Sequence, residues 1–161
     1  MVTRARPGRS SATEDGVAPE DGDLVELLWR AGRAVAERVG AVLAEEAASL
    51  DDWRLLALLR DGGRSMTELA AATGVPPPTL TKRVDRMVAA NLVHRRTDDS
   101  DRRRVLVLLA PRGRALHGRL LPLVEREREH VRRLVEQSGD AAGVTAALHA
   151  LSATEPALPA R

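Results

Sequence analysis

Residues 94–109, HRRTDDSDRRRVLVLL, place five arginines and a histidine around a short acidic segment, next to the most continuously apolar run of the chain. Arginine carries a permanent charge and a fork of N–H donors, so it suits phosphate oxygens or a DNA minor groove. The apolar run predicts a strand that is anchored in the core and holds these cations in place. The DDSD segment lacks the alternating ligands and central glycine of a calcium loop, and we interpret it as a turn.

A second group of polar side chains precedes this stretch. The sequence VPPPTLTKRVDRMVAANLV predicts a helix from about Pro77 to Ala90, ended by a left-handed Asn91. At 100° per residue, one side of this helix is apolar and is expected to be buried: Leu80, Val84, Met87 and Val88. The opposite side is small and polar, with Thr81 and Arg83 on its flanks: Pro78, Thr79, Lys82, Asp85, Arg86 and Ala89. Such a face suits a helix in a major groove, and a plain solvated face is the alternative.

Further helices must position these two groups. Ser65 and Glu68 form a capping-box pattern before a short helix that Gly74 ends, and Ser49 begins another helix. Long helical patterns start near Asp23 and Pro111. We therefore expect a mainly α fold with a small β-hairpin wing, a winged helix-turn-helix flanked by dimerisation helices. The expected division is a disordered tail at 1–20, an N-terminal dimerisation helix at 21–48, the winged helix-turn-helix at 49–110, C-terminal dimerisation helices at 111–155 and a tail at 156–161.

Composition excludes several classes of protein. The chain has 161 residues, which suits one domain, and it contains no cysteine, so disulfides and cysteine-based redox or zinc sites are excluded. No apolar leader or membrane-length stretch is present, and we expect a cytoplasmic protein without membrane contact. The net charge is only +2, but residues 82–104 carry eight basic against four acidic side chains. The basic surface is therefore expected in the middle of the chain.

The stretch SMTELAAATGVPPPTLTKRVDRMVAANLVHRRTDDSDRRRVLVLLAPRGRAL, residues 65–116, resembles the MarR (multiple antibiotic resistance regulator) family of winged-helix transcription regulators. The resemblance rests on an ELA helix, a T-x-x-V-D-R core, a D-x-R wing tip and the apolar strand that follows. It implies a homodimer that binds a pseudo-palindromic operator on double-stranded DNA, and a repressor that a small-molecule effector releases.

Residue by residue, the resemblance assigns DNA contacts to the helix at 77–90 and to the wing. The expected DNA-binding residues are Thr79, Thr81, Lys82, Arg83, Arg86, Arg102 and Arg103. Asp85 and Asp101 are expected to orient cations, and Asp85 matches an aspartate that pairs with the wing arginine, here Arg103.

The resemblance also implies an effector site, because small aromatic or phenolic effectors of the family often bind between the dimer helices and the winged helix, near the positions of Trp29 and Trp53. These two tryptophans are the only aromatic side chains in a chain without Phe or Tyr, and an anionic or aromatic metabolite is expected there. We therefore expect an effector cavity that both tryptophans line, although core filling is the simpler role for Trp53. The four histidines show no metal-ligand spacing and are expected at the surface, so no metal or cofactor is expected. A metal-responsive regulator and a winged-helix scaffold for protein contacts stay open as alternatives. No nucleophile and base set indicates an enzyme.

Overall fold

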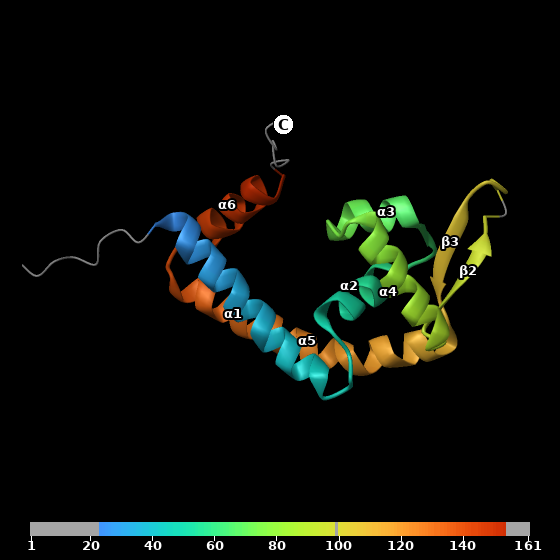
Figure 1. The fold of residues 1–161 in the computed structure, drawn as a ribbon. Helices are drawn as coiled ribbons and strands as arrows, with labels where there is room; N and C mark the ends of the chain where they lie inside the picture. The colour runs from blue at the N-terminus through green and yellow to red at the C-terminus, as the bar shows by residue number, and fades with distance from the viewer. Residues whose placement is uncertain (1–22, 99, 154–161) are drawn as a thin grey trace, which may run out of the picture.

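The computed structural model describes residues 23–98 and 100–153, and it is mainly helical with one small sheet (Figure 1). In chain order the elements are α1 (Leu24–Ala44), α2 (Leu50–Leu58), β1 (Arg64–Ser65), α3 (Met66–Thr73), α4 (Pro77–Ala89), β2 (Val93–Thr97), β3 (Val105–Leu109), α5 (Pro111–Gln137) and α6 (Ala141–Ala153). The expected fold class, a winged helix-turn-helix between flanking helices, is confirmed. The tails expected at 1–20 and 156–161 lie outside the described residues.

Local signals in the sequence set the ends of the short helices. The Ser49 side chain caps α2 and the Ser65 side chain caps α3, each in a complete capping box with the acid three residues later. Gly74 ends α3 with a left-handed φ of 68°. Asn91 has a φ of 57° after α4, so the predicted left-handed residue is confirmed at that position.

The sheet is antiparallel with strand order β1-β3-β2. Strands β2 and β3 form the predicted hairpin, with Val93 opposite Leu109 and Thr97 opposite Val105. The sequence did not predict β1, because a strand of two residues has no periodicity to recognise. It pairs Ser65 with Leu106, and so attaches the start of α3 to the hairpin.

The apolar strand β3 is buried along only part of its length. Val107 and Leu109 are 0% and 2% exposed, which confirms that the apolar run is anchored in the core, but Val105 at the start of the strand is 47% exposed. Val105 is the first residue of the strand and faces Thr97, which is also exposed, so no helix of residues 23–98 and 100–153 covers this end of the hairpin. The wing is anchored at its base alone.

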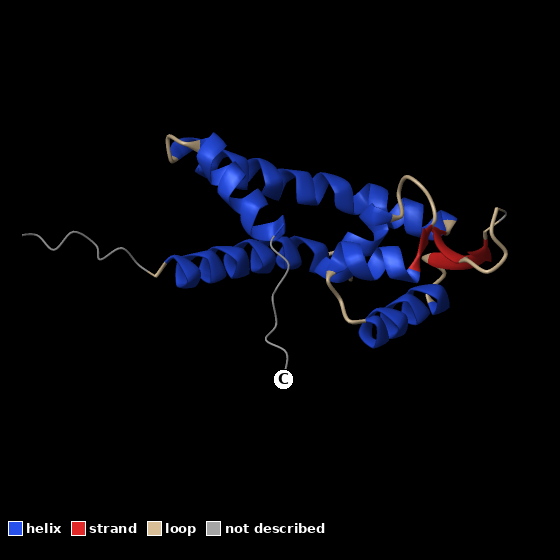
Figure 2. Ribbon diagram, turned by 90° about the horizontal axis from the view of Figure 1, so that it is seen from above, coloured by secondary structure: helices blue, strands red, loops and turns tan. Residues whose placement is uncertain are grey.

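Two groups of helices surround the core. Helices α3 and α4 pack against the sheet and α2 packs on α3 and α5, while α1 lies along α5 and α6 follows at the far end (Figure 1). Figure 2 shows the strands together at one end of the molecule and the start of α1 at the other. The largest fully buried side chains are Leu43, Leu55, Leu56, Leu69, Leu80, Leu109, Leu120, Val84, Val93 and Val107. Within the described residues, no helix combines the length and apolar character that a membrane crossing requires.

Trp53 and His117 join α2 to α5. Trp53 is 4% exposed and stacks on the His117 ring at a centroid distance of 4.9 Å and an interplanar angle of 6°. His117 is itself buried, so the expectation of a surface position is wrong for this histidine. Burial lowers its pKa, with the nearby Arg60 charge acting in the same direction, because both disfavour the imidazolium. The pair packs as two stacked rings in the core.

Gly113 and Gly118, both on α5, provide a test of this packing. A Cβ built on Gly113 would lie 2.0 Å from the Leu92 carbonyl oxygen, whereas a Cβ on Gly118 meets nothing within 4 Å. We expect Gly113→Ala to lower the free energy of unfolding by about 1–3 kcal/mol, because backbone must move apart. Gly118→Ala is expected to raise it by about 0.5–1 kcal/mol, because alanine favours the helix. Urea unfolding measures both, and equal effects of the two variants would contradict the close approach.

Candidate nucleic-acid interface

Burial of one side of α4 fixes which side faces solvent. Leu80 and Val84 are each 1% exposed and Met87 is 3% exposed, as the helical spacing predicted. The residues opposite them are all exposed: Pro78, Thr79, Lys82, Asp85, Arg86 and Ala89. Among the described residues, no hydrogen bond or ion pair engages the Lys82 or Arg86 side chain. Two cations are thus held outward on a rigid helix with no partner in this part of the chain.

The start of α4 offers fewer backbone donors than most helix termini. Pro76 is the N-cap residue and makes no side-chain cap, and Pro77 and Pro78 have no N–H group. The Leu80 N–H already donates to the Pro76 carbonyl at 3.0 Å. The Thr79 N–H is therefore the one backbone donor that the first turn can direct at an anion.

Thr81 lies beside this face and is exposed. Its hydroxyl donates to the Pro77 carbonyl at 2.9 Å, four residues earlier in the same helix. The hydroxyl proton is engaged within α4, but the oxygen keeps lone pairs that can accept a hydrogen bond.

Arg83 does not join the outward cations. Its Nη2 lies 2.7 Å from Oδ2 of Asp51, and its Nη1 lies 3.5 Å from Oδ1 of Asp52 and 3.2 Å from the Ser49 hydroxyl. The side chain is only 17% exposed. The expected DNA contact is therefore not what the geometry favours, since this guanidinium joins α4 to the start of α2. Its position on the flank of the helix allowed either direction.

Asp98 and Asp101 accept hydrogen bonds from neighbouring residues at the end of the wing. An Asp98 carboxylate oxygen accepts from the N–H and hydroxyl of Ser100, and these bonds lower the pKa of Asp98. An Asp101 oxygen accepts from the Arg103 N–H at 2.9 Å. Asp101 thus orients the backbone of Arg103, whereas the sequence suggested that it orients a cationic group. For the described residues of this segment, these bonds and the Arg104 N–H donation to the Asp101 carbonyl at 2.8 Å are those of a turn.

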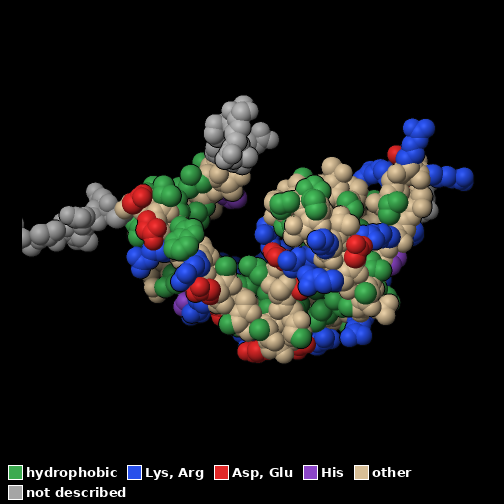
Figure 3. Space-filling view, viewed as in Figure 1, with side chains coloured by type: hydrophobic (Ala, Val, Ile, Leu, Met, Phe, Trp, Pro, Cys, Tyr) green, Lys and Arg blue, Asp and Glu red, His purple; other side chains and the backbone are tan. Residues whose placement is uncertain are grey.

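Arg102 and Arg103 stand at the tip of this turn. Both are exposed, and among the described residues neither guanidinium has a hydrogen bond or ion pair. Figure 3 shows cationic side chains extending from the wing beyond the rest of the surface. Because they extend past the sheet, these two arginines can reach a groove next to the one that α4 faces.

Asp85 pairs with a different arginine from the one expected. Its Oδ1 lies 2.8 Å from Nη1 of Arg95 on β2, so the predicted pairing with Arg103 is wrong. Strand β2 packs on α4, whereas Arg103 lies at the distant tip. Strand alternation could have indicated this, since Arg95 is two residues after the buried Val93 and so lies on the same side of the sheet. The ion pair makes the outer face of α4 continuous with the wing.

A further ion pair at the base of the wing had no signal in the sequence. Nη2 of Arg104 lies 2.9 Å from Oε1 of Glu68 on α3. These residues are 36 positions apart, and only the fold brings them together. The wing therefore has two groups of arginines. Arg95 and Arg104 form ion pairs with acids on helices. Arg102 and Arg103 form no ion pair with the described residues and point into solvent.

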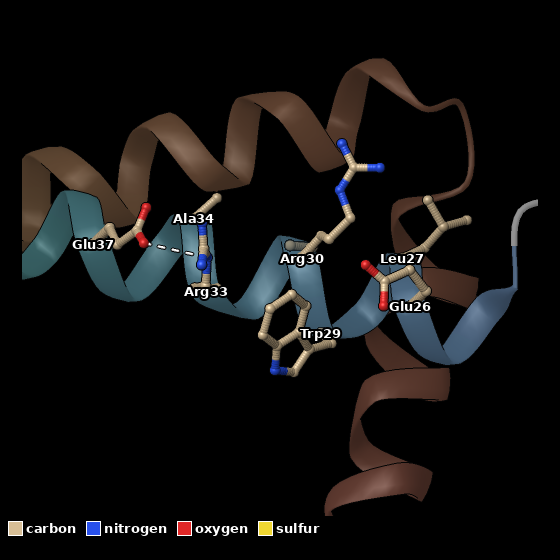
Figure 4. Close-up of a pocket in the computed structure, with 8 residues that line it drawn as sticks. Glu26, Leu27, Trp29, Arg30, Arg33, Ala34 and Glu37 are labelled. Carbon is tan, nitrogen blue, oxygen red and sulfur yellow. Dashed lines mark ion pairs between the residues drawn. The ribbon is translucent and has the colours of Figure 1, made fainter.

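Within the described residues of one chain, Trp29 and Trp53 line two separate hollows, so an effector site that both line stays a prediction. Trp29 is 58% exposed and lies in a hollow of about 640 Å³ on α1, where the Arg33 guanidinium lies 5.3 Å from the ring centroid. Figure 4 shows its ring projecting away from the Arg30 side chain. Trp53 lines a separate hollow of about 380 Å³ with Arg54, Ala57, Leu58, Asp61, Arg64, Ala72 and Arg128. The second hollow combines an aromatic ring with three arginines.

Comparison with known proteins is consistent with this geometry. A model of the MarR family matches residues 49–104. Over 121 residues the chain is 32% identical to the HTH-type transcriptional repressor NicR of Pseudomonas putida (strain KT2440). This alignment covers 70% of this chain and 77% of NicR.

Two solved structures share the fold at 26% sequence identity. The transcriptional repressor CouR bound to a 23-mer DNA duplex superposes with a TM-score of 0.71, and the match covers 81% of this chain and 92% of the CouR chain. CouR from Rhodococcus jostii RHA1 bound to p-coumaroyl-CoA has a TM-score of 0.67, covering 74% of this chain and 89% of its own.

The different surroundings of Arg83 and Lys82 lead to a stability test. Arg83→Gln removes a largely buried guanidinium that pairs with two carboxylates. Because both carboxylates keep partial contact with solvent, we expect the variant to lower the free energy of unfolding by about 1 kcal/mol. Lys82→Gln, one residue earlier on the exposed face, should change that free energy by less than about 0.5 kcal/mol. Chemical denaturation of both variants measures the difference. A Lys82 variant as destabilised as the Arg83 variant would contradict the division between packing and exposed cations.

Proposed function

Because this chain belongs to the MarR family of transcriptional regulators, we propose that it is a sequence-specific DNA-binding repressor that acts in the cytoplasm as a homodimer on a pseudo-palindromic operator. In this proposal residues 49–110 bind DNA, while residues 21–48 and 111–155 form the dimer. Its relative NicR is a transcriptional repressor, and the related CouR binds a DNA duplex. Both relatives support repression and operator binding.

The outward face of α4 carries the proposal. Lys82 and Arg86 are exposed on the side of α4 opposite the buried stripe. In a winged helix-turn-helix, the helix in the place of α4 is the one that enters a major groove. Thr79 supplies the backbone donor at the helix start, and Thr81 lies beside it. Arg102 and Arg103 extend the basic surface toward a minor groove. A scaffold for protein contacts, the alternative, would favour apolar or acidic residues at these positions.

Exposed apolar side chains support the dimer. Among the described residues, all but one of the large exposed hydrophobic side chains lie on α1, α5 and α6: Leu24, Val25, Leu27, Trp29, Val35, Leu134, Leu148 and Leu151. An isolated chain would leave this surface in water, whereas a second copy that covers it gains the free energy of apolar burial. Two copies related by a two-fold axis would present two α4 helices to two half-sites.

The hollow beside Trp53 supports an effector of anionic, aromatic character. The lining of this hollow includes three arginines, Arg54, Arg64 and Arg128, one carboxylate, Asp61, and the aromatic residue Trp53. It lies among α2, α3 and α5, so a ligand there would contact both the DNA-binding unit and a helix of the proposed dimer. The related CouR binds p-coumaroyl-CoA, which supports small-molecule control in this part of the family.

Selection from a random DNA pool, followed by titration of the selected duplex, tests DNA recognition. We expect an inverted repeat with half-sites roughly 34–36 Å apart, bound by two chains. Lys82→Ala and Arg86→Ala should weaken specific binding by about 1–3 kcal/mol, and random duplex less, if either contacts a base edge. The packing variant Arg83→Gln is the matched control and should bind almost as the parent does. A parent protein with no preferred sequence would contradict the proposal.

Benzoate serves as a simple test compound for the effector hollow. If an aromatic carboxylate binds beside Trp53, benzoate should weaken operator binding by the parent, and Arg54→Gln should reduce this effect because a cation is lost. Benzamide, which has the same ring without the charge, is the control ligand. Equal responses of the parent and the Arg54 variant to benzoate would contradict the assignment of this hollow.

A further inference from the structure

We propose that Glu68 is a positioning residue for DNA recognition, which caps α3 and at the same time holds the wing in place through Arg104. This inference rests on the proposed function, because it concerns where the wing arginines stand when the protein binds an operator.

The two oxygens of the Glu68 carboxylate have separate partners. Oε2 accepts from the Ser65 N–H at 2.7 Å and from its hydroxyl at 2.8 Å, which forms the capping box of α3. Oε1 accepts from Nη2 of Arg104 at 2.9 Å. Since each oxygen has its own donors, the cap and the wing contact exist together without competition.

The same residues close a ring around the base of the wing. Ser65, which Glu68 caps, pairs in the sheet with Leu106 of β3. Arg104 lies immediately before β3 and returns to Glu68. The start of α3 is thus joined to β3 by backbone pairing and again by the ion pair, two residues nearer the tip.

Among the described residues, Arg104 makes the ion pair to a helix that lies nearest to the tip on this side of the wing. Val105 is 47% exposed, so hydrophobic burial holds this point of the wing less than it holds Val107 and Leu109. Beyond it, the turn is closed by its own hydrogen bonds, with the Asp98 N–H donating to the Arg104 carbonyl at 2.9 Å. Arg102 and Arg103 therefore depend on Arg104 for a connection to α3.

The opposite strand has the corresponding contact at Arg95, which pairs with Asp85 on α4. With both ion pairs in place, the hairpin is fixed to α3 on one side and to α4 on the other. Without the Glu68 contact, the hairpin can pivot about its paired base. The wing arginines would then lose their fixed distance from Lys82 and Arg86.

The test uses Glu68→Gln, because glutamine also forms a capping box and so removes the charge while retaining the cap. Exposed ion pairs contribute up to about 1 kcal/mol, so we expect a loss of specific affinity of about threefold to fivefold. Simple electrostatics predicts the opposite sign, since removal of an acid near DNA increases affinity. A gain or no change in affinity would therefore overturn the inference.

A double-mutant cycle separates positioning from other effects. Arg104→Gln should lower affinity, and adding Glu68→Gln to it should cost nothing more. Glu68→Gln should also have a smaller effect in an Arg103→Ala background, because the wing then lacks one of the groups to be positioned. Glu46→Gln breaks a comparable exposed ion pair, to Arg119 at 2.9 Å, away from the wing. Because both residues belong to the proposed dimer ranges, this variant serves only as the control for wing mobility. Additive losses throughout the cycle would overturn the inference.

A measurement without DNA distinguishes failure of this inference from failure of the proposed function. The chain has no cysteine, so a nitroxide on Thr97→Cys, at the exposed end of β2, labels the wing alone. We expect a more mobile spectrum in the Glu68→Gln background and no change with Glu46→Gln. An unchanged spectrum would overturn the positioning role even if the parent binds its operator. A parent that binds no selected duplex would instead remove the proposed function, and the inference about recognition with it.

Discussion

Burial of the apolar stripe of α4 is the constraint on which the rest of the structure depends. Leu80, Val84 and Met87 pack into the core, and their burial determines the rotation of the helix about its axis. Lys82 and Arg86 must then face solvent, since they lie on the opposite side. Because the stripe includes three large, almost fully buried side chains, a rotation of even one residue would expose apolar surface and bury charge, which is strongly unfavourable.

The wing depends on the same core but only at its base. Val107 and Leu109 anchor β3, while the exposed Val105 marks the end of hydrophobic support. From that point, polar contacts replace packing: ion pairs to Asp85 and Glu68 and hydrogen bonds within the turn. Such exposed contacts contribute little to stability, but they restrict direction, and direction is what a DNA-contacting arm needs. Stability and positioning therefore come from different residues of one hairpin.

The flanking helices give the chain a second apolar surface, distinct from the core. Helices α1 and α5 pack on each other, yet both keep large hydrophobic side chains in solvent, and α6 buries no residue at all. One buried core joins α2, α3, α4 and β3 to the adjoining ends of α1 and α5, while the exposed apolar side chains of α1, α5 and α6 are the surface that the proposed dimer would cover. The Trp53 hollow lies where these two parts meet, so a ligand there would affect their relative arrangement.

Local chemistry in the sequence by itself determined the helices, their caps and the exposed face of α4, because capping boxes, glycine and asparagine stops and 3.6-residue periodicity act over a few residues. The resemblance of residues 65–116 also indicated the fold and the family. The tertiary structure decided which charges meet: Arg83 with Asp51, Arg95 with Asp85 and Arg104 with Glu68. It also decided that His117 is buried and that the two tryptophans lie apart. Long arginine side chains can reach several partners, and only the packing of distant elements selects one of them.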